Sequence, residues 1–511
     1  MRSKQAFRNM LANIFLQIAV LAVGFILPRF FLETYGDDIS GMMVTASQFL
    51  MCLSLAEAGI GTASVVALYK PLADKDKKQM NLVLSATNRF YKRSGLIFGA
   101  LLLALVVIFP FVISEQIEPT LIRAVLFVMG ATTFIDYFFL GKYRVLLQAD
   151  QKVYVLSLVE MGGTLLNLGI SITLIQNNAN VVLVRLVATL IFLLRFFIIR
   201  SFVRKQYPQV SFREKADFQL ITQRGAALIH QVAGVIVSNT DMVILAVFMG
   251  SRSLLEANVY ATYNLAVNAI NTLLSTGINA FMAGFGEVFS KKESKTLKRT
   301  YLQYEYLFFI VLFTVCACMW PLILPFVGVY AIRAPQGVEN YIRPVAGMLF
   351  VLVVFLQNVR IPSLTMVCAA GHFEETKKQA ILETVINLVV SLALVHWLGL
   401  TGVLLGTVAS FAYRTLAIVI YNGKHLVKGT LYTTGKRLLR NMVLLVGIII
   451  VSMKVIPQSM QNFVEWFLYA LAVGSVSLLL FCILNYAFEP QEFREVWLRV
   501  RNILGDKFKK S

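Results

Sequence analysis

Long apolar runs dominate this chain and alternate with short stretches of polar and basic residues. Fourteen runs are each about long enough for a membrane-spanning helix, which needs roughly 20 apolar residues. Helix is expected throughout, because lipid cannot satisfy exposed backbone groups and the runs are too long for barrel strands. The predicted spans cover residues 8–31, 42–69, 94–114, 120–141, 153–176, 181–199, 225–249, 257–283, 305–329, 344–369, 379–397, 400–421, 441–457 and 463–487.

The basic residues orient these spans. Most of the 47 Lys and Arg residues lie in the tails and loops on the side of the amino terminus. Short loops rich in Lys and Arg stay in the cytoplasm, so both termini are predicted to be cytoplasmic. The formal charge of +20 then faces anionic lipid headgroups, which argues against nucleic acid as a partner. The opposite loops hold only Arg252, Arg333, Arg343 and Lys454.

Composition excludes an ordinary soluble domain. The chain has 511 residues, of which 58% are hydrophobic and 14% charged. Its opening apolar run is too long for a signal peptide and lacks a small-residue cleavage site, so it is predicted to be a retained first span. The five cysteines show no metal-ligand spacing and are expected to pack as small hydrophobic residues. No metal, cofactor or catalytic residue is therefore predicted.

Weak internal similarity predicts a duplicated six-helix unit. Three pairs of segments share nearly one offset and one order along the chain, and transporter folds are often built from such repeats. An even number of spans in each unit makes the two halves parallel repeats. The expected organisation is an N-lobe at 1–224 with spans 1–6, a C-lobe at 225–422 with spans 7–12, and residues 423–511 with spans 13 and 14 and a cytoplasmic amphipathic tail. The matching pairs are Gln17–Gly36 with Gln231–Gly250, Gly59 with Gly277, and Asn167 with Asn387.

Polar residues follow one face of spans 1, 2, 7 and 8. Polar groups avoid lipid, so these faces are predicted to line a polar cavity between the two halves. The alternative is helix packing, since small and amide residues also hold membrane helices together. The candidate cavity residues are Gln17, Arg29, Glu57, His230, Asn239, Asp241, Asn264, Asn268 and Asn271.

Three of these candidates could also have simpler roles. Arg29 suits an anionic group such as phosphate, because a guanidinium stays charged and donates in a planar fork; it could instead extend to the outer headgroups. His230 could titrate near neutrality or act as a hydrogen-bonded spacer. Glu57 lies near mid-depth, where an ion requires a partner or water.

Other charges in the spans are predicted to be structural. Glu160 with Arg195, and Glu383 with Arg414, occupy comparable places in the two repeats and are each expected to form an ion pair. Asp136 and Arg360 are candidates to join these clusters, while Arg123 and Arg185 are expected to extend toward the outer headgroups.

Several segments resemble one known family. They are ALIHQVAGVIVSNTDMVILAVFMG followed by VYATYNLAVNAINTLL, LAEAGIGTASVVALYKPLADKDKKQMN, and YRVLLQADQKVY between spans 4 and 5. In this order over 14 spans, the whole chain resembles the polysaccharide flippases, of O-antigen and teichoic-acid type, in the multidrug, oligosaccharidyl-lipid and polysaccharide exporter superfamily.

The resemblance implies two six-helix lobes around a central cavity lined by spans 1, 2, 7 and 8, working by alternating access. Members of the family carry undecaprenyl-diphosphate-linked sugars from the inner to the outer leaflet, for cell-surface polysaccharide assembly. The implied partners are that glycan, membrane lipids, a coupling proton or sodium ion, and a polysaccharide polymerase. The resemblance would place Arg29, Glu57, Asn239, Asp241 and the Asn264, Asn268 and Asn271 face in the cavity.

Two alternatives remain open at the level of sequence. A cation-coupled multidrug exporter of the same superfamily is the first, although many exporters resemble one another in an acidic residue of the first span, where this chain has Gln17. A membrane enzyme is the second, although the outer loops are too short to supply the acids or metal carboxylates such reactions need. Direct use of ATP is not expected, since no nucleotide-binding motif is present.

Overall fold

The computed structural model describes residues 2–57, 60–113, 117–212, 214, 225–276, 294–457 and 459–495. Within these residues every regular element is a helix. Contacts divide the chain into two compact units. Unit 1 is Met1–Asn258 with Ala334–Gln336, and unit 2 is Val259–Arg333 with Gly337–Ser511. The division by contacts falls at Asn258, after the seventh predicted span, whereas the predicted lobes divide before that span.

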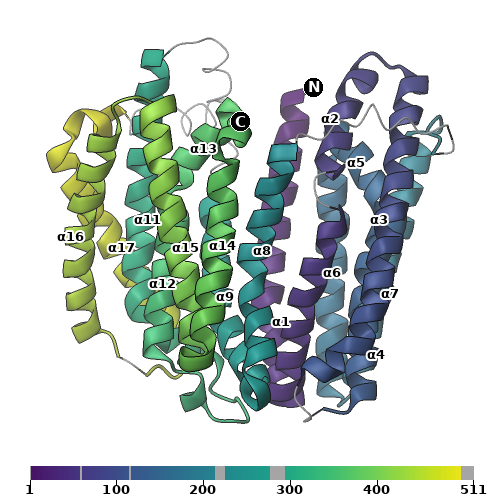
Figure 1. Ribbon diagram of the computed structural model, residues 1–511, viewed down its shortest axis with the longest axis horizontal. Helices are drawn as coiled ribbons and strands as arrows, with labels where there is room; N and C mark the ends of the chain where they lie inside the picture. Colours follow the sequence, from purple (N-terminus) through teal and green to yellow (C-terminus); the bar gives the residue numbers. More distant parts are fainter. Residues whose placement is uncertain are drawn as a thin grey trace. The chain divides into compact units, whose positions relative to one another are not determined.

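Unit 1 is built from a series of helices, of which the first, α1, is divided into two segments by a kink at Gly36 (Figure 1). Three short helical turns, η1, η2 and η4 (Gly250–Arg252), interrupt the series within the described residues, and η2 is a π-helix. The elements are α1 (Arg2–Leu53), η1 (Ser54–Glu57), α2 (Ile60–Ala73), α3 (Lys77–Val112), α4 (Pro119–Ile135), η2 (Asp136–Leu140), α5 (Gly141–Ala149), α6 (Val153–Gln176), α7 (Val181–Gln206) and α8 (Gly225–Phe248).

Unit 2 contains the remaining long helices, of which α9 begins in unit 1 and continues into unit 2. The last described residues, 489–495, follow its final helix, and the rest of the predicted amphipathic tail, 496–511, lies outside the described residues. The elements are α9 (Ser253–Thr276), α11 (Ser294–Tyr330), α12 (Pro344–Val359), α13 (Ile361–Ala370), α14 (Phe373–Leu398), α15 (Leu400–Tyr421), η6 (Asn422–Leu426), α16 (Leu431–Val455) and α17 (Phe463–Phe488).

Twelve helices of the described residues are long and apolar enough to cross a membrane, so the chain is a multi-pass membrane protein. They differ from the fourteen predicted spans at two places. The twelve include α1 as one helix, although the kink at Gly36 divides it into a segment that matches the first predicted span and a segment that begins the second. Helix α9, which carries several amide side chains, is not among the twelve. The end of the eighth predicted span, 277–283, lies outside the described residues. The count of fourteen therefore stays a prediction.

The second predicted span is a broken helix. Within α1, Gly36 has a non-helical backbone with a φ of +85°, which glycine tolerates, and this kink lies in the loop predicted between the first two spans. The helix then ends at Leu53, η1 follows, and α2 begins at Ile60. Lipid cannot satisfy the backbone groups that a break frees, so breaks at membrane depth are tolerated where they are buried in protein or line a cavity.

The core of unit 1 is one continuous apolar cluster. In it, α1 packs against α6 and α8, α3 packs against α4, and α4 packs against α7 (Figure 1). Large apolar side chains also remain on the outside of the helices, such as Phe111, which is 81% exposed. This arrangement fits a lipid solvent, in which outward apolar side chains carry no penalty.

In unit 2 the closest helix pair is α14 with α15, where glycines let the two backbones approach. A Cβ at Gly402 would lie 2.5 Å from the carbonyl oxygen of Leu394, and one at Gly406 would lie 2.1 Å from Ser391 Oγ. Asn387 Nδ2 also donates to Thr407 Oγ1 across the pair at 3.0 Å. Small residues four apart, with an interhelical hydrogen bond, are a common way to associate helices in lipid.

We expect Gly402→Val to destabilise the purified protein by about 1–3 kcal/mol, because the added carbons must push α15 off the α14 backbone. The measurement is thermal unfolding in detergent. Gly447→Val is the matched control, since a Cβ at Gly447 meets nothing within 4 Å. Equal melting temperatures for the two variants would contradict the packing role of Gly402.

Candidate functional site

The break in the second span opens onto a cavity of about 290 Å³ inside unit 1. Its walls come from η1, α2, α3, η2, α5 and α8. A helix break and a π-helical turn both border it; π-turns are frequent at functional sites, and broken helices often hold ions in membrane carriers. This space is named the η1 cavity here. It is lined by Ser54, Leu55, Glu57, Gly61, Tyr91, Tyr137, Arg144, Gln148, Gln231 and Val235.

Glu57 is the acidic group at the helix break. The hydroxyl of Tyr91, from α3, donates a 2.5 Å hydrogen bond to Glu57 Oε1. The ring of Tyr91 passes over Gly141 at the start of α5, where a Cβ would lie only 2.4 Å from it. Glycine at position 141 therefore gives Tyr91 the room to reach Glu57. Among the described residues, no Lys or Arg side chain lies within ion-pair distance of Glu57.

Arg144 and Asp136 form an ion pair beside Glu57. The pair joins α5 to the π-helical turn η2, since Arg144 Nη2 donates to Asp136 Oδ1. Tyr137 supports the break from the same side, because its hydroxyl donates to the carbonyl of Ser54 at 2.9 Å. This bond satisfies a backbone acceptor close to the point where the helix is interrupted.

The lining of the cavity thus carries one carboxylate, Glu57, and one guanidinium, Arg144, whose ion-pair partner Asp136 is not part of the lining. Arg144 is balanced by Asp136, which leaves Glu57 with a tyrosine hydroxyl as its partner. A carboxylate inside a membrane protein is costly when it is charged without a counter-ion, and the uptake of a proton or another cation removes that cost. The chemistry that this arrangement supports is reversible binding of a cation at Glu57.

Of the residues predicted to line a cavity, six belong to unit 1, and Glu57 alone of the six borders the η1 cavity. Arg29 Nε lies 2.8 Å from Glu33 Oε1, one turn along α1. Asn239 Nδ2 donates to the carbonyl of Val235 at 2.7 Å, and Asp241 is 1% exposed. Gln17 in α1 and His230 in α8 are partly buried.

The three predicted asparagines of α9 belong to unit 2. Asn271 donates to Gln357 Oε1 at 3.0 Å and accepts from Asn358 Nδ2 at 2.8 Å, both on α12. Asn268 is exposed and Asn264 is partly buried. Asn271 therefore holds two helices of unit 2 together. The central cavity expected between the two halves stays a prediction.

The four residues predicted to form structural ion pairs differ between the repeats. In unit 2, Arg414 Nε lies 3.5 Å from Glu383 Oε2, and Arg360 Nη1 lies 2.5 Å from Glu383 Oε1. In unit 1, Arg195 Nη2 donates to Thr164 Oγ1 at 3.0 Å, and Thr164 lies one turn along α6 from Glu160. Arg360 thus shares Glu383 with Arg414.

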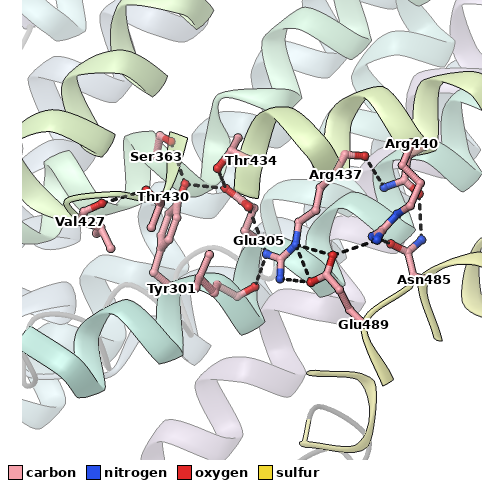
Figure 2. A network of polar contacts seen from close by, with 12 residues as sticks. Tyr301, Glu305, Ser363, Val427, Thr430, Thr434, Arg437, Arg440, Asn485 and Glu489 are labelled. Carbon is pink, nitrogen blue, oxygen red and sulfur yellow. Dashed lines mark hydrogen bonds and ion pairs between the residues drawn. The ribbon is translucent and has the colours of Figure 1, made fainter. Parts of the chain in front are cut away.

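A larger buried network in unit 2 was not predicted. Figure 2 shows Arg437 of α16 between Glu305 of α11 and Glu489, which follows α17. Arg437 Nη1 lies 3.2 Å from Glu305 Oε1, and Arg437 Nη2 lies 2.5 Å from Glu489 Oε2. These guanidinium contacts lower the pKa of the Glu489 carboxyl, although burial alone would raise it. The network joins the last two long helices to α11.

Three groups of the η1 cavity were not predicted from the sequence. Tyr91, Tyr137 and Arg144 come from three different elements, and single-sequence patterns do not show which distant residues meet. A partial signal existed, because Arg144 and Gln148 lie in the segment YRVLLQADQKVY at a spacing of one helical turn. Within the described residues, no group of three or more His, Cys, Asp or Glu side chains is placed to hold a metal.

Comparison with known proteins shows a likeness of structure. No family model and no curated protein matches the sequence. An inward-facing multidrug resistance MATE family transporter of the MOP superfamily is similar, with a TM-score of 0.63 and 14% identity, over 83% of this chain and 99% of that one. An outward-facing structure of such a transporter has a TM-score of 0.58 and 15% identity, over 85% and 96%.

A third similar structure is a MOP superfamily transporter from Pyrococcus furiosus, described as having a binding pocket whose reverse polarity suggests a different function. Its TM-score is 0.59 at 14% identity, and the match covers 84% of this chain and 96% of that one. At these identities the likeness establishes the fold: this chain has the helical fold of MATE transporters of the MOP superfamily.

Proposed function

We propose that this chain is a secondary transporter that works by alternating access and is driven by a cation that binds at Glu57. The observation that carries the proposal is the η1 cavity, where a membrane-embedded carboxylate lies at a helix break with a tyrosine as its partner. The fold supports it, since similar structures are described as inward-facing and outward-facing transporters. No enzymatic activity is proposed.

Coupling requires that the cation and the substrate favour different conformations of the transporter. Glu57 and Ser54 belong to η1, and α2 resumes directly beyond the break, so a change of charge at Glu57 acts on the joint between two helical segments. A cation can shift a conformational equilibrium only through different interactions with the two states. Loss of the charge on Glu57, or of its bond to Tyr91, supplies such a difference.

For the substrate, we propose a polyprenyl-diphosphate-linked oligosaccharide carried from the cytoplasmic to the outer leaflet for cell-surface polysaccharide assembly. Support comes from the resemblance of the sequence segments to polysaccharide flippases and from the polar stripes that the sequence predicts to face inward in both halves. The implied setting is a bacterial cell membrane with cytoplasmic termini and a polysaccharide polymerase as a partner. The coupling ion would be a proton or sodium.

A cation-coupled multidrug exporter is the second candidate, and the comparisons favour it. Several similar structures are described as multidrug resistance or MATE transporters, and none of those reported above is described as a flippase. Glu57 would serve an exporter equally well, because a drug cation and a proton can compete for one carboxylate. The Pyrococcus furiosus protein is described as having a binding pocket whose reverse polarity suggests a different function, so the fold alone does not choose between the two candidates.

Purified protein in vesicles separates the two candidates. We expect an imposed proton or sodium gradient to move a fluorescent polyprenyl-diphosphate-linked disaccharide to the opposite leaflet, measured by chemical quenching of the exposed probe. A cationic dye added to matched vesicles tests export. Dye movement without lipid movement would replace the flippase with the exporter, and movement of neither probe under any gradient would contradict the proposed transport.

A further inference from the structure

A second cavity in unit 1, also of about 290 Å³, lies on the other side of the helix break. Helices α1, α4 and α7 form its walls, and it is named the Arg185 cavity here. One residue, Ser54, borders both this cavity and the η1 cavity. Its polar lining is a single guanidinium surrounded by hydroxyl groups, from Ser47, Ser54, Thr132, Thr133, Arg185 and Thr189.

Arg185 has unusually weak partners for a charged group in a spanning helix. Its Nε and Nη2 each lie 3.2 Å from Met43 Sδ, and its guanidinium carbon lies 4.5 Å from the centre of the Phe31 ring. A thioether is a weak hydrogen-bond acceptor. A cation–π contact with a ring face replaces only part of the stabilisation that water gives to a charged guanidinium. Among the described residues, no carboxylate lies within ion-pair distance of Arg185.

Several other arginines of the helices have carboxylate partners, whereas Arg195 donates to the hydroxyl of Thr164. Arg144 is bound to Asp136, and Arg360 and Arg414 share Glu383. A lasting positive charge at this depth is expensive unless an anion balances it, because the surrounding protein and lipid screen it poorly. A negative charge from a ligand would therefore be stabilised in the Arg185 cavity.

The hydroxyl groups fit an oxyanion. Thr133 Oγ1 makes no hydrogen bond to any described residue, so its proton is available. Ser47 Oγ donates to the carbonyl of Met43 at 2.8 Å, and Thr189 Oγ1 donates to that of Arg185 at 3.1 Å. Each can turn about χ1 and donate to a ligand instead. A guanidinium fork with several hydroxyl donors matches the tetrahedral oxygens of phosphate.

We propose that the Arg185 cavity binds the phosphate group of an amphiphilic phosphate ester. The group comes from the diphosphate of the transported lipid or from a phospholipid headgroup of the bilayer. At about 290 Å³ the cavity is at the lower limit of ordinary ligand pockets, which suits a headgroup and excludes a whole sugar chain. Through Ser54 the bound phosphate lies beside the joint that carries Glu57. Its role in transport rests on the proposed function, but its binding does not.

The test is equilibrium binding by the full chain in detergent, with no gradient applied. The probes are geranylgeranyl diphosphate, phosphatidylglycerol and inorganic diphosphate, and the readouts are bound lipid by native mass spectrometry and thermal stabilisation. We expect Arg185→Gln to weaken binding of an amphiphilic phosphate by about 10-fold or more. Arg123→Gln is the matched control, an exposed arginine on α4 of the same unit, and it should bind as the natural protein does.

The probes identify the source of the phosphate. Binding of geranylgeranyl diphosphate that depends on Arg185 and exceeds that of phosphatidylglycerol assigns the cavity to the substrate, and the reverse order assigns it to bilayer lipid. Thr133→Val is a second variant that keeps the side-chain shape and should weaken binding about 5-fold. If both variants fold and bind every probe as the natural protein does, the proposal is wrong. That result would leave gradient-driven transport, measured separately in vesicles, untouched.

Discussion

Glu57→Gln should abolish gradient-driven transport while leaving the protein folded. Glutamine keeps the size of the side chain and can still accept the hydrogen bond that Tyr91 donates to Glu57. It cannot lose or gain a charge, so the cation no longer distinguishes the two conformations of the transporter. Coupling free energies of ~1–3 kcal/mol correspond to changes in affinity of as much as about 150-fold. We expect transport driven by a pH or sodium gradient to fall by about 100-fold.

Exchange measured without a gradient separates coupling from substrate binding. Vesicles loaded with unlabelled substrate should exchange it for external labelled substrate at nearly the natural rate in the Glu57→Gln variant. A loss of substrate binding would instead stop both activities. Glu160→Gln is the matched control, because Glu160 is an exposed acid on α6 of the same unit. Full gradient-driven transport by the Glu57→Gln variant would contradict a coupling role for this residue.

The fold class and the positions of most spans follow from local properties of the sequence. A run of about 20 apolar residues has to be a spanning helix wherever it occurs in the chain, so most spans were predicted within a few residues. The break at Ser54–Glu57 was not predicted, because the segment from residue 42 to 69 is apolar on both sides of it. The boundary before this segment has a local signal, since the kink at Gly36 falls in the polar stretch predicted as the loop between the first two spans.

The candidate site was predicted only in part, for a related reason. Glu57 stood out because an acidic residue in an apolar run is costly anywhere along the run. Arg144 did not, because it falls in a cytoplasmic loop of the predicted topology, where arginine is ordinary. In the structure most residues of that predicted loop form helix α5. Asp136, at the start of the π-helical turn η2, forms an ion pair with Arg144. Which side chains of different helices meet depends on tertiary contacts, and the periodicity of apolar residues in one sequence does not show these contacts.

The same limit applied to Arg185. Arg185 lies one turn into α7, so its side chain was predicted to extend toward the outer headgroups. The structure instead turns the guanidinium onto Met43 and the ring of Phe31, both on α1. An arginine that faces the protein interior requires a different explanation from one that faces a headgroup. Binding of a phosphate group in the Arg185 cavity is the explanation proposed above.

The largest effect on stability is expected at Arg437, the centre of the network in Figure 2. Arg437 and Glu305 are 1% and 0% exposed, and Arg437 Nη1 also donates to the carbonyl of Leu302 at 2.8 Å. Arg437→Met would leave Glu305 as a buried charge without its counter-ion. We expect the free energy of unfolding to fall by about 3–5 kcal/mol, which is the usual cost of breaking a buried pair from one side.

Unfolding of the purified protein in detergent, by heat or denaturant, measures this loss. Lys436→Met is the matched control, because Lys436 is the exposed neighbour of Arg437 on the same helix and should lose little. Arg437→Met combined with Glu305→Gln should regain much of the stability, since the buried charge is then gone; Thr434 and Tyr301 still donate to position 305. If the double variant is no more stable than Arg437→Met alone, the loss comes from the packing of the arginine and not from its charge.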